Sequence, residues 1–504
     1  YKNYVLKYNI FNPIISWVIK KRISRINKFI HEPIKSQENL LIKLIRKSEN
    51  TIWGKNHNYK NIKNYENFKK NVPIQNYDDI KYYLELIKSG KENVLWPNKI
   101  ISFAKSSGTT NDKSKLIPLT KESLKECHLT AGKDLLSIYV NQFPKTKIFS
   151  GKSLMIGGSN EIEKNTKILT GDLSSILIEN LPIWAQIIST PQKKIALMAN
   201  WEEKLEKMVS KIINQDIRSI SGVPSWTIIL LERILEKSGK KKIIDIWPNL
   251  ELFMHGGISI SPYMKSFENL IGKKINYLEI YNASEGFFAL QNDFKKSDLL
   301  LMLDYGVFYE FIPTNNNNSS EIIPIGMVKK NTNYEVVIST NGGLWRYKIG
   351  DTIKFTSIKP YKILITGRTK HYINYFGEEL MVHNTDAAIN KTSKQTNSVV
   401  NEYTVAPKIF SNNSGCHEWI IEFNNPPKNL EKFINILDEN LKKVNSDYEA
   451  KRQGDLLLKK PIIHITKKHF FYNWLKTKNK LGGQNKVPRL SNDRNNIEKL
   501  LKFL

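Results

Sequence analysis

Alternation between helical and strand-like hydrophobic patterns is the feature that most limits how this chain can fold. Apolar residues recur at helical spacing over residues 205–212 and 226–235. Short runs rich in β-branched residues lie between and after these helices, at 252–254, 275–280, 334–340 and 361–365. Helices that alternate with short strands are typical of an α/β domain. The sequence therefore predicts an α/β fold for the middle of the chain.

The N-terminal region has a different pattern. Roughly the first 95 residues are expected to be helical, with Ser36 as the N-cap of a helix whose apolar face includes Leu41 and Ile45. A strand-like run follows at 99–104 and leads into the polar stretch 106–115. A helical N-terminal region thus precedes the α/β region.

A polar junction at 366–370 separates the α/β region from a smaller unit. The smaller unit has its own pattern of strand, helix and strand, at 419–423, 430–441 and 461–465. We therefore expect two domains. These are a large N-terminal α/β domain at 1–366 and a small, mobile C-terminal α+β domain at 367–504, joined by a hinge.

The positive charge of the chain does not by itself indicate a nucleic-acid partner. Lys and Arg number 77 against 48 Asp and Glu, which gives a net charge of +29. Only 10 of the 77 are Arg, although nucleic-acid-binding proteins rely on Arg for bidentate and stacking contacts. The lysines are spread over the whole chain among abundant Ile and Asn, and all three residue types have A/T-rich codons. Genome composition is a sufficient explanation, and we expect no dedicated nucleic-acid partner.

Several classes of protein are excluded by what the sequence lacks. Cys127 and Cys416 lie far apart and form no CxxC motif, which argues against a disulfide scaffold and a structural zinc site. No apolar run approaches the ~18 residues of a membrane helix. The nine histidines show no HExxH or comparable spacing, so no dedicated catalytic metal site is expected. We expect a cytoplasmic protein with no membrane partner. Because the first residue is Tyr1, a removed leader is left open.

The stretch 106–115, which reads SSGTTNDKSK, has the composition of an anion-binding loop. Hydroxyls, a glycine and backbone N–H groups after a strand can surround a phosphate, and lysines add charge. The stretch lacks the second Gly directly before Lys that the Walker pattern requires. An ordinary turn rich in Ser and Thr explains the same residues. Taken alone, the stretch leaves both interpretations open.

Three further groups of residues carry possible chemistry. Residues 281–286 read YNASEG, in which the Tyr can stack on a purine, the Ser can bond a phosphate and the Glu can hold Mg²⁺. Residues 344–351 read LWRYKIGD, in which the Asp can accept hydrogen bonds from ribose hydroxyls. Residues 482–489 read GGQNKVPR, which places a Lys on a glycine-containing loop. Taken singly, a strand end, a hairpin turn and a solvated lysine explain them equally well.

Together and in this order, the motifs resemble those of one known family. They are SSGTT at 106–110, YNASEG at 281–286, LWRYKIGD at 344–351, TGR at 366–368 and GGQNKVPR at 482–489. From about Phe11 to Arg494, the chain resembles the acyl-acid amido synthetases of auxin-responsive type, and specifically a bacterial-like member. These ligases join carboxylic acids to amino acids and belong to the adenylate-forming superfamily, with acyl-CoA synthetases and luciferases. The resemblance implies a large adenylate-forming domain and a small mobile one.

The resemblance also assigns a nucleotide site residue by residue. It places the loop that grips phosphate on Ser106, Ser107, Gly108, Thr109 and Thr110, with Lys115 as an added charge. It places the adenine-stacking Tyr, the phosphate-contacting hydroxyl and the Mg²⁺ carboxylate on Tyr281, Ser284 and Glu285. It places the ribose-binding Asp and the Arg beside the junction on Asp351 and Arg368. A backbone segment against adenine falls on Gly256 and Gly257.

The catalytic lysine of the family, which reaches the α-phosphate of ATP, falls on Lys486, and Lys480 is a weaker substitute. Two positions depart from the family pattern. Asp112 stands where many relatives carry Gly, which weakens the attraction of the loop for triphosphate. Lys370 stands where the wider superfamily often has an Asp hinge.

The activity implied is ATP- and Mg²⁺-dependent adenylation of a carboxylic acid, followed by transfer of the acyl group to an amino acid. An acyl-CoA synthetase would share every ATP-site residue and is the first alternative. A non-catalytic basic binding protein derived from the family is the second. The pocket for the acid is expected near residues 224–226 and 287–288, although aromatic and apolar residues at such positions more often belong to the core. The acid, the acceptor and the oligomeric state are beyond the reach of the sequence.

Overall fold

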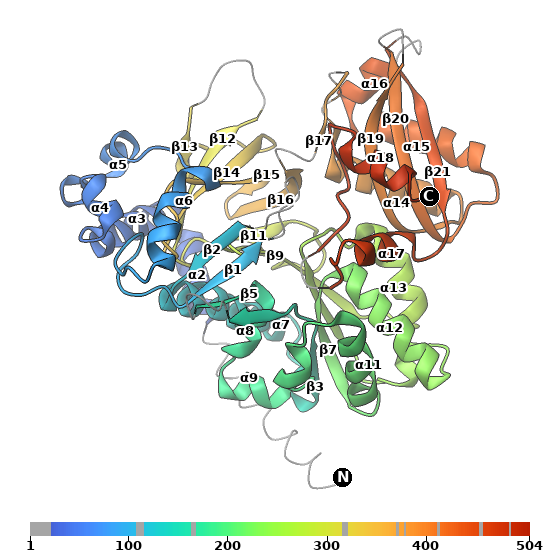
Figure 1. Cartoon of the computed structure of the whole chain (residues 1–504), viewed down its shortest axis with the longest axis horizontal. Coiled ribbons are helices and arrows are strands. Elements are labelled where there is room, and N and C mark those ends of the chain that lie inside the picture. The colour runs from blue at the N-terminus through green and yellow to red at the C-terminus, as the bar shows by residue number, and fades with distance from the viewer. Residues whose placement is uncertain are drawn as a thin grey trace.

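A long mixed sheet runs through the larger part of the molecule (Figure 1). The computed structural model describes residues 22–106, 115–162, 168–314, 321–368, 372–376, 378, 380–410, 414–452, 457–482 and 485–504. Within these residues the long sheet has 12 strands, in the order β13-β12-β14-β15-β16-β11-β10-β9-β8-β7-β3-β6. Their bounds are β3 (Lys152–Met155), β6 (Ser189–Thr190), β7 (Ile217–Gly222), β8 (Leu252–Gly256), β9 (Asn276–Ala283), β10 (Gly286–Leu290), β11 (Leu299–Leu301), β12 (Val307–Pro313), β13 (Ile323–Pro324), β14 (Asn333–Thr340), β15 (Tyr347–Ile358) and β16 (Tyr361–Arg368).

One half of the sheet is parallel and carries the helices that the sequence predicts. Strands β6, β3, β7, β8 and β9 run parallel. Helix α12 (Pro224–Ser238) connects β7 to β8, and α13 (Met264–Ile271) follows β8. Helix α11 (Trp201–Ile212) buries the apolar face predicted over 205–212. The α/β prediction is confirmed for this half.

The other half of the sheet is antiparallel, which the alternation did not predict. Strands β9 and β10 form a hairpin, and β14, β15 and β16 pair antiparallel with one another. The strands predicted at 334–340 and 361–365 are β14 and β16 of this half. Antiparallel neighbours need only short connections, so no helix has to separate them.

A second sheet, in the order β2-β1-β5-β4, packs beside the first. Its strands are β1 (Ser102–Ser106), β2 (Lys115–Leu119), β4 (Asn160–Ile162) and β5 (Leu169–Asp172). The strand predicted at 99–104 therefore begins later, at Ser102, where the paired register with Leu119 of β2 begins.

Further helices, besides α11, α12 and α13, lie around the two sheets. They are α2 (Ile23–His31), α3 (Pro33–Ser48), α4 (Ile52–Asn56), α5 (Tyr65–Asn71), α6 (Tyr77–Lys88), α7 (Thr130–Gln142), α8 (Leu173–Glu179), α9 (Ile183–Ile188) and α10 (Lys193–Ala196), with a π-helical turn η2 (Ser123–Leu129) before α7.

The N-cap predicted at Ser36 is wrong. Helix α3 begins at Pro33. Proline is favoured in the first turn, where a backbone N–H would have no acceptor within the helix, so its lack of an N–H costs nothing. Ser36 lies inside that turn, and its hydroxyl donates to the backbone oxygen of Glu32 at 2.7 Å. Leu41 and Ile45 are buried, as predicted.

The small domain has a three-stranded sheet in the order β19-β20-β21, next to the β17-β18 ribbon. Its elements are β17 (Tyr372–Ile373), β18 (Leu380–Met381), α14 (Val382–Gln395), β19 (Val399–Ile409), β20 (Gly415–Asn425), α15 (Leu430–Val444), α16 (Ser446–Arg452), β21 (Leu458–Thr466), α17 (Phe470–Thr477) and α18 (Asn495–Leu501). The predicted strand, helix and strand are β20, α15 and β21. Figure 1 shows this domain, in orange and red, above α12 and α13.

The junction between the domains is described only in part. Strand β16 runs to Arg368, so Gly367 and Arg368 end a strand of the long sheet. Lys370 lies outside the described residues. The boundary between 366 and 367 stays a prediction.

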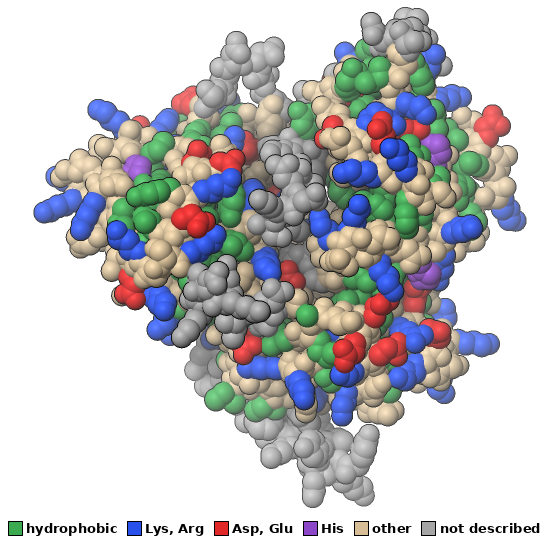
Figure 2. Space-filling model, in the orientation of Figure 1, with side chains coloured by type: hydrophobic (Ala, Val, Ile, Leu, Met, Phe, Trp, Pro, Cys, Tyr) green, Lys and Arg blue, Asp and Glu red, His purple; other side chains and the backbone are tan. Residues whose placement is uncertain are grey.

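The positively charged side chains on the surface are dispersed, as the sequence predicts. Figure 2 shows Lys and Arg side chains spread over one face of the molecule and interspersed with Asp and Glu. Within the described part of the chain, no helix has the length and apolar character needed to cross a membrane.

Candidate functional site

A bulge in β15 sets the direction of Asp351. Thr352 pairs with Glu335 of β14, and Lys348 pairs with Val337. Three residues of β15, 349–351, therefore lie opposite one residue of β14, Val336. Gly350, in the middle of the bulge, has φ +80°, a left-handed conformation that favours glycine. Bulges change the direction in which the following side chain points. Gly350 thus allows the bulge that orients Asp351, and Asp351 supplies the carboxylate.

Asp351 joins three sequence motifs. Its Oδ2 accepts a hydrogen bond from the hydroxyl of Tyr281 on β9 at 2.7 Å, and its Oδ1 accepts one from Nε of Arg368 at the end of β16, at 2.9 Å. Burial, and then the charge of Asp351, raise the pKa of Tyr281 well above its ordinary value, which keeps the phenol protonated as a donor. A carboxylate has about four lone-pair sites, so Asp351 retains acceptors for a ligand.

Tyr281 is more buried than a ring that is free to stack on adenine would be. Its side chain is 6% exposed, and its ring makes an edge contact with Phe288 at 4.9 Å between centroids. Adenine stacking on Tyr281 stays a prediction.

The turn between β9 and β10 carries Ser284 and Glu285. The hydroxyl of Ser284 donates to the backbone oxygen of Lys105 at 3.4 Å, which places this turn beside the end of β1. Burial raises the pKa of Glu285, and Asp351 adds to the rise, whereas Arg368 and Lys115 oppose it. Glu285 therefore lies among the charged groups that the other motifs contribute.

The first motif meets this turn through the ends of its strands. Ser106 ends β1 and Lys115 begins β2, and the two are register partners. The ammonium of Lys115 lies 5.5 Å from the centre of the Tyr77 ring. Four predicted members of the phosphate loop, Ser107, Gly108, Thr109 and Thr110, lie outside the described residues, as does Asp112.

Glu285 fits the role of a Mg²⁺ ligand. Its carboxylate is a hard oxygen donor, and it stands close enough to Asp351 that the charge of Asp351 helps to raise the pKa of Glu285. A divalent cation between such groups and phosphate oxygens relieves that repulsion. Among the described residues no group of three or more His, Cys, Asp and Glu side chains could hold a metal ion by itself.

Lys486 of the small domain reaches into the same site. Its Nζ donates to the backbone oxygen of Gly257, just after β8, at 2.5 Å. Gly257 has φ +83°, so this close approach uses a conformation that favours glycine. Burial, and then the charge of Arg368, lower the pKa of Lys486 to about 8, while Asp351 opposes the shift. Lys486 is thus charged at pH 7 and forms part of the Asp351–Arg368 group.

The neighbouring glycine is needed for packing. A Cβ on Gly256 would come within 2.6 Å of the backbone oxygen of Ile280 on β9. Gly256 therefore allows β8 and β9 to approach each other, and Gly257 accepts the lysine.

The structure brings together the described members of all five motifs. They lie at the carboxyl ends of β8, β9 and β16, at the bulge in β15 and at the paired ends of β1 and β2. These members are Ser106, Lys115, Gly257, Tyr281, Ser284, Glu285, Asp351, Arg368 and Lys486. Ligands of α/β sheets bind at the carboxyl ends of parallel strands. The substitute, Lys480, is not the lysine that contacts Gly257.

The residues expected near the acid pocket have different surroundings. Phe287 and Phe288 are 4% and 0% exposed and belong to the main core, and Trp226 is 3% exposed in the contact between the two domains. Phe287 and Phe288 therefore pack in the core, whereas Ser225 and Trp226 line a pocket that also includes Lys486. A pocket for the acid near residues 224–226 stays a prediction. The indole N–H of Trp226 donates to the backbone oxygen of Asn485, beside Lys486, at 3.1 Å.

One motif residue has a structural role that the sequence analysis did not assign. Arg346 is buried and donates to both carboxylate oxygens of Glu310 and to the backbone oxygens of Lys69 and Val72. It joins the N-terminal helices to the long sheet. Arg489, the last residue of the GGQNKVPR motif, belongs to a second group that was not predicted, because its partners Tyr263 and Asp386 lie far away in the sequence.

Comparison with known families matches most of the chain to the three domains of one family. Residues 22–275 match the GH3 family N-terminal domain, residues 300–368 the GH3 family central domain, and residues 383–495 the GH3 family C-terminal domain.

Individual relatives are distant in sequence. The chain is 22% identical to indole-3-acetic acid-amido synthetase GH3.4 of Arabidopsis thaliana, over 70% of this chain and 69% of the relative. It is 23% identical to jasmonoyl--L-amino acid synthetase JAR4 of Nicotiana attenuata, over 64% and 66%. It is 23% identical to 4-substituted benzoates-glutamate ligase GH3.12 of A. thaliana, over 58% and 61%. The matches thus span about two thirds of each relative or less.

Solved structures share the fold over nearly the whole chain. The GH3.15 acyl acid amido synthetase superposes with a TM-score of 0.77 at 16% identity, covering 96% of both chains. A 2-hydroxyisobutyryl-CoA ligase in the postadenylation state superposes with a TM-score of 0.55 at 12% identity, covering 97% of this chain and 91% of the ligase. The fold prediction, a large α/β domain with a smaller C-terminal domain, is confirmed.

Proposed function

The chain belongs to the GH3 family, and from this membership we propose that it is a ligase that activates a carboxylic acid with ATP and transfers the acyl group to an amino acid. The observation that carries the proposal is the group formed by Tyr281, Asp351, Arg368 and Lys486. The residues come from four motifs, and a lysine of the small domain completes the group.

The names of the relatives support amide formation more than any single substrate. By name, one is an amido synthetase for indole-3-acetic acid, one makes a jasmonoyl-amino acid and one ligates 4-substituted benzoates with glutamate. The acids differ, and the bond formed is the same. We therefore propose the reaction class for this chain and leave the acid unassigned.

The charges of the site suit the first half-reaction. A carboxylate that attacks ATP is an anion that approaches a polyanion, so the barrier is largely electrostatic. Lys486 and Arg368 place two positive charges beside the site, and Lys115 stands at the base of the proposed phosphate loop, Ser106–Thr110. Asp351 has acceptor sites that would serve the ribose hydroxyls, and the Ser284 hydroxyl, beside the end of β1, would contact phosphate.

Magnesium fits this arrangement as the companion of ATP. Glu285 would be its protein ligand, and the cation would neutralise charge on the phosphate oxygens when bound. Glu285 also stands beside Asp351 and Lys115, so the chain itself sets the local balance of charge there.

The second half-reaction requires that the lysine leave. Pyrophosphate departs, and the acyl-adenylate is a mixed anhydride. We propose that the small domain then turns about residues 366–370 and carries Lys486 away, which opens a path for the acceptor. The amine forms a C–N bond to the acyl carbon, the bond from that carbon to the AMP oxygen breaks, and the amine loses a proton.

Two other functions use the same sequence features. An acyl-CoA synthetase would bind ATP through the same residues and use a thiol as acceptor; family membership favours the amine. A non-catalytic basic protein would need a concentrated positive surface, and Figure 2 shows none on the face drawn.

Acceptor-dependent release of AMP tests the choice of acceptor. With an acid that supports adenylate formation, trapped as the hydroxamate by hydroxylamine, amino acids should accelerate AMP release and yield an amide. Acceleration by coenzyme A alone would assign the chain to thioester formation instead. An Asp351→Ala variant, which should form no adenylate, serves as the blank for both reactions.

A further inference from the structure

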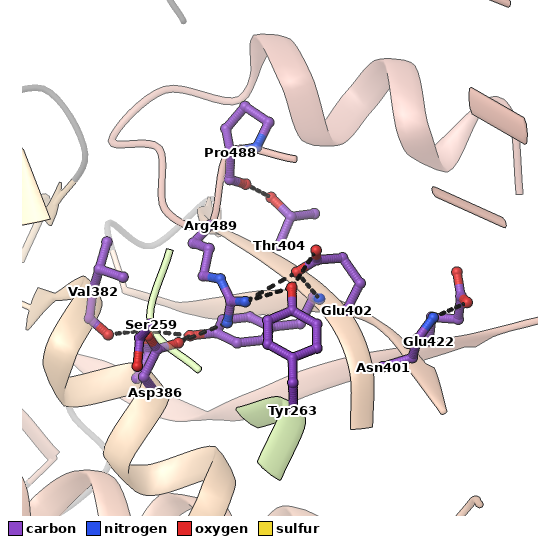
Figure 3. Close-up of polar contacts among 12 residues, drawn as sticks. Ser259, Tyr263, Val382, Asp386, Asn401, Glu402, Thr404, Glu422, Pro488 and Arg489 are labelled. Carbon is purple, nitrogen blue, oxygen red and sulfur yellow. Dashed lines mark hydrogen bonds and ion pairs between the residues drawn. The ribbon is translucent and has the colours of Figure 1, made fainter. Parts of the chain in front are cut away.

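A buried cluster around Arg489 connects the two domains. Arg489 is 6% exposed and donates to Oδ1 of Asp386 at 2.7 Å and to the hydroxyl of Tyr263 at 2.9 Å (Figure 3). Its guanidinium lies 4.5 Å from the centre of the Tyr403 ring. Glu402 completes the group at 3.3 Å from Arg489.

Tyr263 is the member of this cluster that the large domain contributes. It ends the short helix η5 (Ser261–Tyr263), whereas Asp386, Glu402 and Arg489 belong to the small domain. Its hydroxyl donates to Oε2 of Glu402 at 2.7 Å while it accepts from Arg489. One hydroxyl group therefore makes two charge-assisted hydrogen bonds across the domain boundary.

A second polar contact joins the same elements. Asn390 of α14 donates to the hydroxyl of Ser261, also in η5, at 2.7 Å. The η5 helix thus contacts both α14 and β19 of the small domain.

The cluster lies on the segment that carries Lys486. The backbone oxygen of Pro488 accepts from the Thr404 hydroxyl at 2.6 Å, and that of Arg489 accepts from Val405 N–H at 2.9 Å. This fixes the segment to β19. The position of Lys486 relative to the nucleotide site therefore depends on where β19 sits on the large domain.

We propose that Tyr263, Glu402 and Arg489 form a latch that holds the small domain in the arrangement in which Lys486 reaches the nucleotide site. Tyr263 is then a positioning residue for the adenylation half-reaction. This assignment rests on the proposed function, because it uses the two half-reactions of an adenylate-forming ligase.

The latch is built to open without leaving a charge unpaired. When the small domain turns, Arg489 keeps Asp386 and Glu402, which move with it. Only the neutral hydroxyl of Tyr263 loses its partners, and water can replace them. A buried ion pair split between the domains would cost far more to separate. The arrangement therefore suits a contact that forms and breaks in every catalytic cycle.

Substitution of the Tyr263 hydroxyl is the sharpest test. Tyr263→Phe keeps the buried ring and removes both hydrogen bonds. We expect acid-dependent exchange of pyrophosphate into ATP to fall roughly tenfold or more, because hydrogen bonds to charged groups are strong, and acyl transfer from a supplied acyl-adenylate to be unchanged or faster.

Tyr448→Phe is the matched control. The buried Tyr448 hydroxyl donates to Asp438 at 2.7 Å, and Asp438 pairs with Arg452, so this cluster has the same chemistry within the small domain. The control should leave the ratio of the two half-reactions unchanged. An equal loss of both half-reactions in Tyr263→Phe, or the same change of ratio in Tyr448→Phe, would overturn the latch.

Small-angle X-ray scattering separates the latch from the proposed function. If the latch is correct, Tyr263→Phe has a larger radius of gyration than the wild-type protein and Tyr448→Phe does not, whether or not any acid supports exchange. An unchanged radius together with an unchanged ratio of half-reactions would refute the latch. Failure of the wild-type protein to exchange pyrophosphate with any acid would instead refute the proposed function.

Discussion

Replacement of Lys486 by Ala tests the part of the site that the small domain supplies. Lys486 Nζ lies 2.5 Å from the backbone oxygen of Gly257, within the electrostatic reach of Asp351 and Arg368. A unit charge ~4 Å from a phosphate charge, at an effective dielectric constant of ~20, contributes ~4 kcal/mol. Since ~1.4 kcal/mol corresponds to a factor of ten, adenylation should slow by ~10³-fold.

The assay separates the two half-reactions. Adenylation is followed as acid-dependent exchange of labelled pyrophosphate into ATP. Acyl transfer is followed as amide formation from a supplied acyl-adenylate. Because Lys486 is expected to leave the site before transfer, the second rate should stay close to that of the wild-type protein.

A neighbouring lysine provides the control. Lys480→Ala removes a charge from the same C-terminal region and should leave both rates near those of the wild-type protein. Equal losses of both rates in Lys486→Ala would refute the proposed role of Lys486. A selective loss of exchange in Lys480→Ala would move that role to Lys480.

Three further predictions concern charge, ligand binding and stability. The pKa of Lys486 is lowered to about 8, so the side chain is charged below that pH and neutral above it. The value of kcat/KM for ATP in the exchange reaction should therefore fall about tenfold per pH unit above pH 8, and Lys486→Arg should abolish this fall. A flat pH profile in the wild-type protein would contradict this prediction. Asp351→Ala or Glu285→Ala should reduce exchange by ~10²-fold or more through lost charge-assisted contacts without changing the circular dichroism spectrum; exchange at the wild-type rate in both variants would remove them from the nucleotide site. Glu310→Ala should lower the free energy of unfolding in urea by ~3–5 kcal/mol, because Arg346 is left buried without its carboxylate; a loss below ~1 kcal/mol would show that Arg346 finds other partners.

Local patterns in the sequence predicted the parallel half of the fold. The helices over 205–212 and 226–235 and the strand at 252–254 each follow from the spacing of their own apolar residues. The antiparallel half did not follow, because its connections are short and leave no helix between strands. The start of α3 was missed because a proline in the first turn outweighs a serine farther along.

The site shows the same division between local and long-range information. The motifs, read with the family resemblance, named the residues that meet around Asp351 and Lys486. The bond between Tyr263 and Glu402 joins residues 139 positions apart, and no spacing rule connects them. Arg346 stands in a motif beside site residues, yet its contacts show a brace between the N-terminal helices and the sheet. Sequence reasoning finds chemistry that a short motif carries and misses contacts that only the tertiary fold creates.

Carboxylate-dependent exchange of labelled pyrophosphate into ATP is the first measurement to make, across a panel of small aromatic and aliphatic acids. We predict exchange with at least one acid, dependent on Mg²⁺ and lost in Asp351→Ala. That result would establish reversible adenylation and identify the class of acid. An absence of exchange with every acid, together with an absence of ATP binding, would contradict the assignment of the chain as an adenylate-forming ligase.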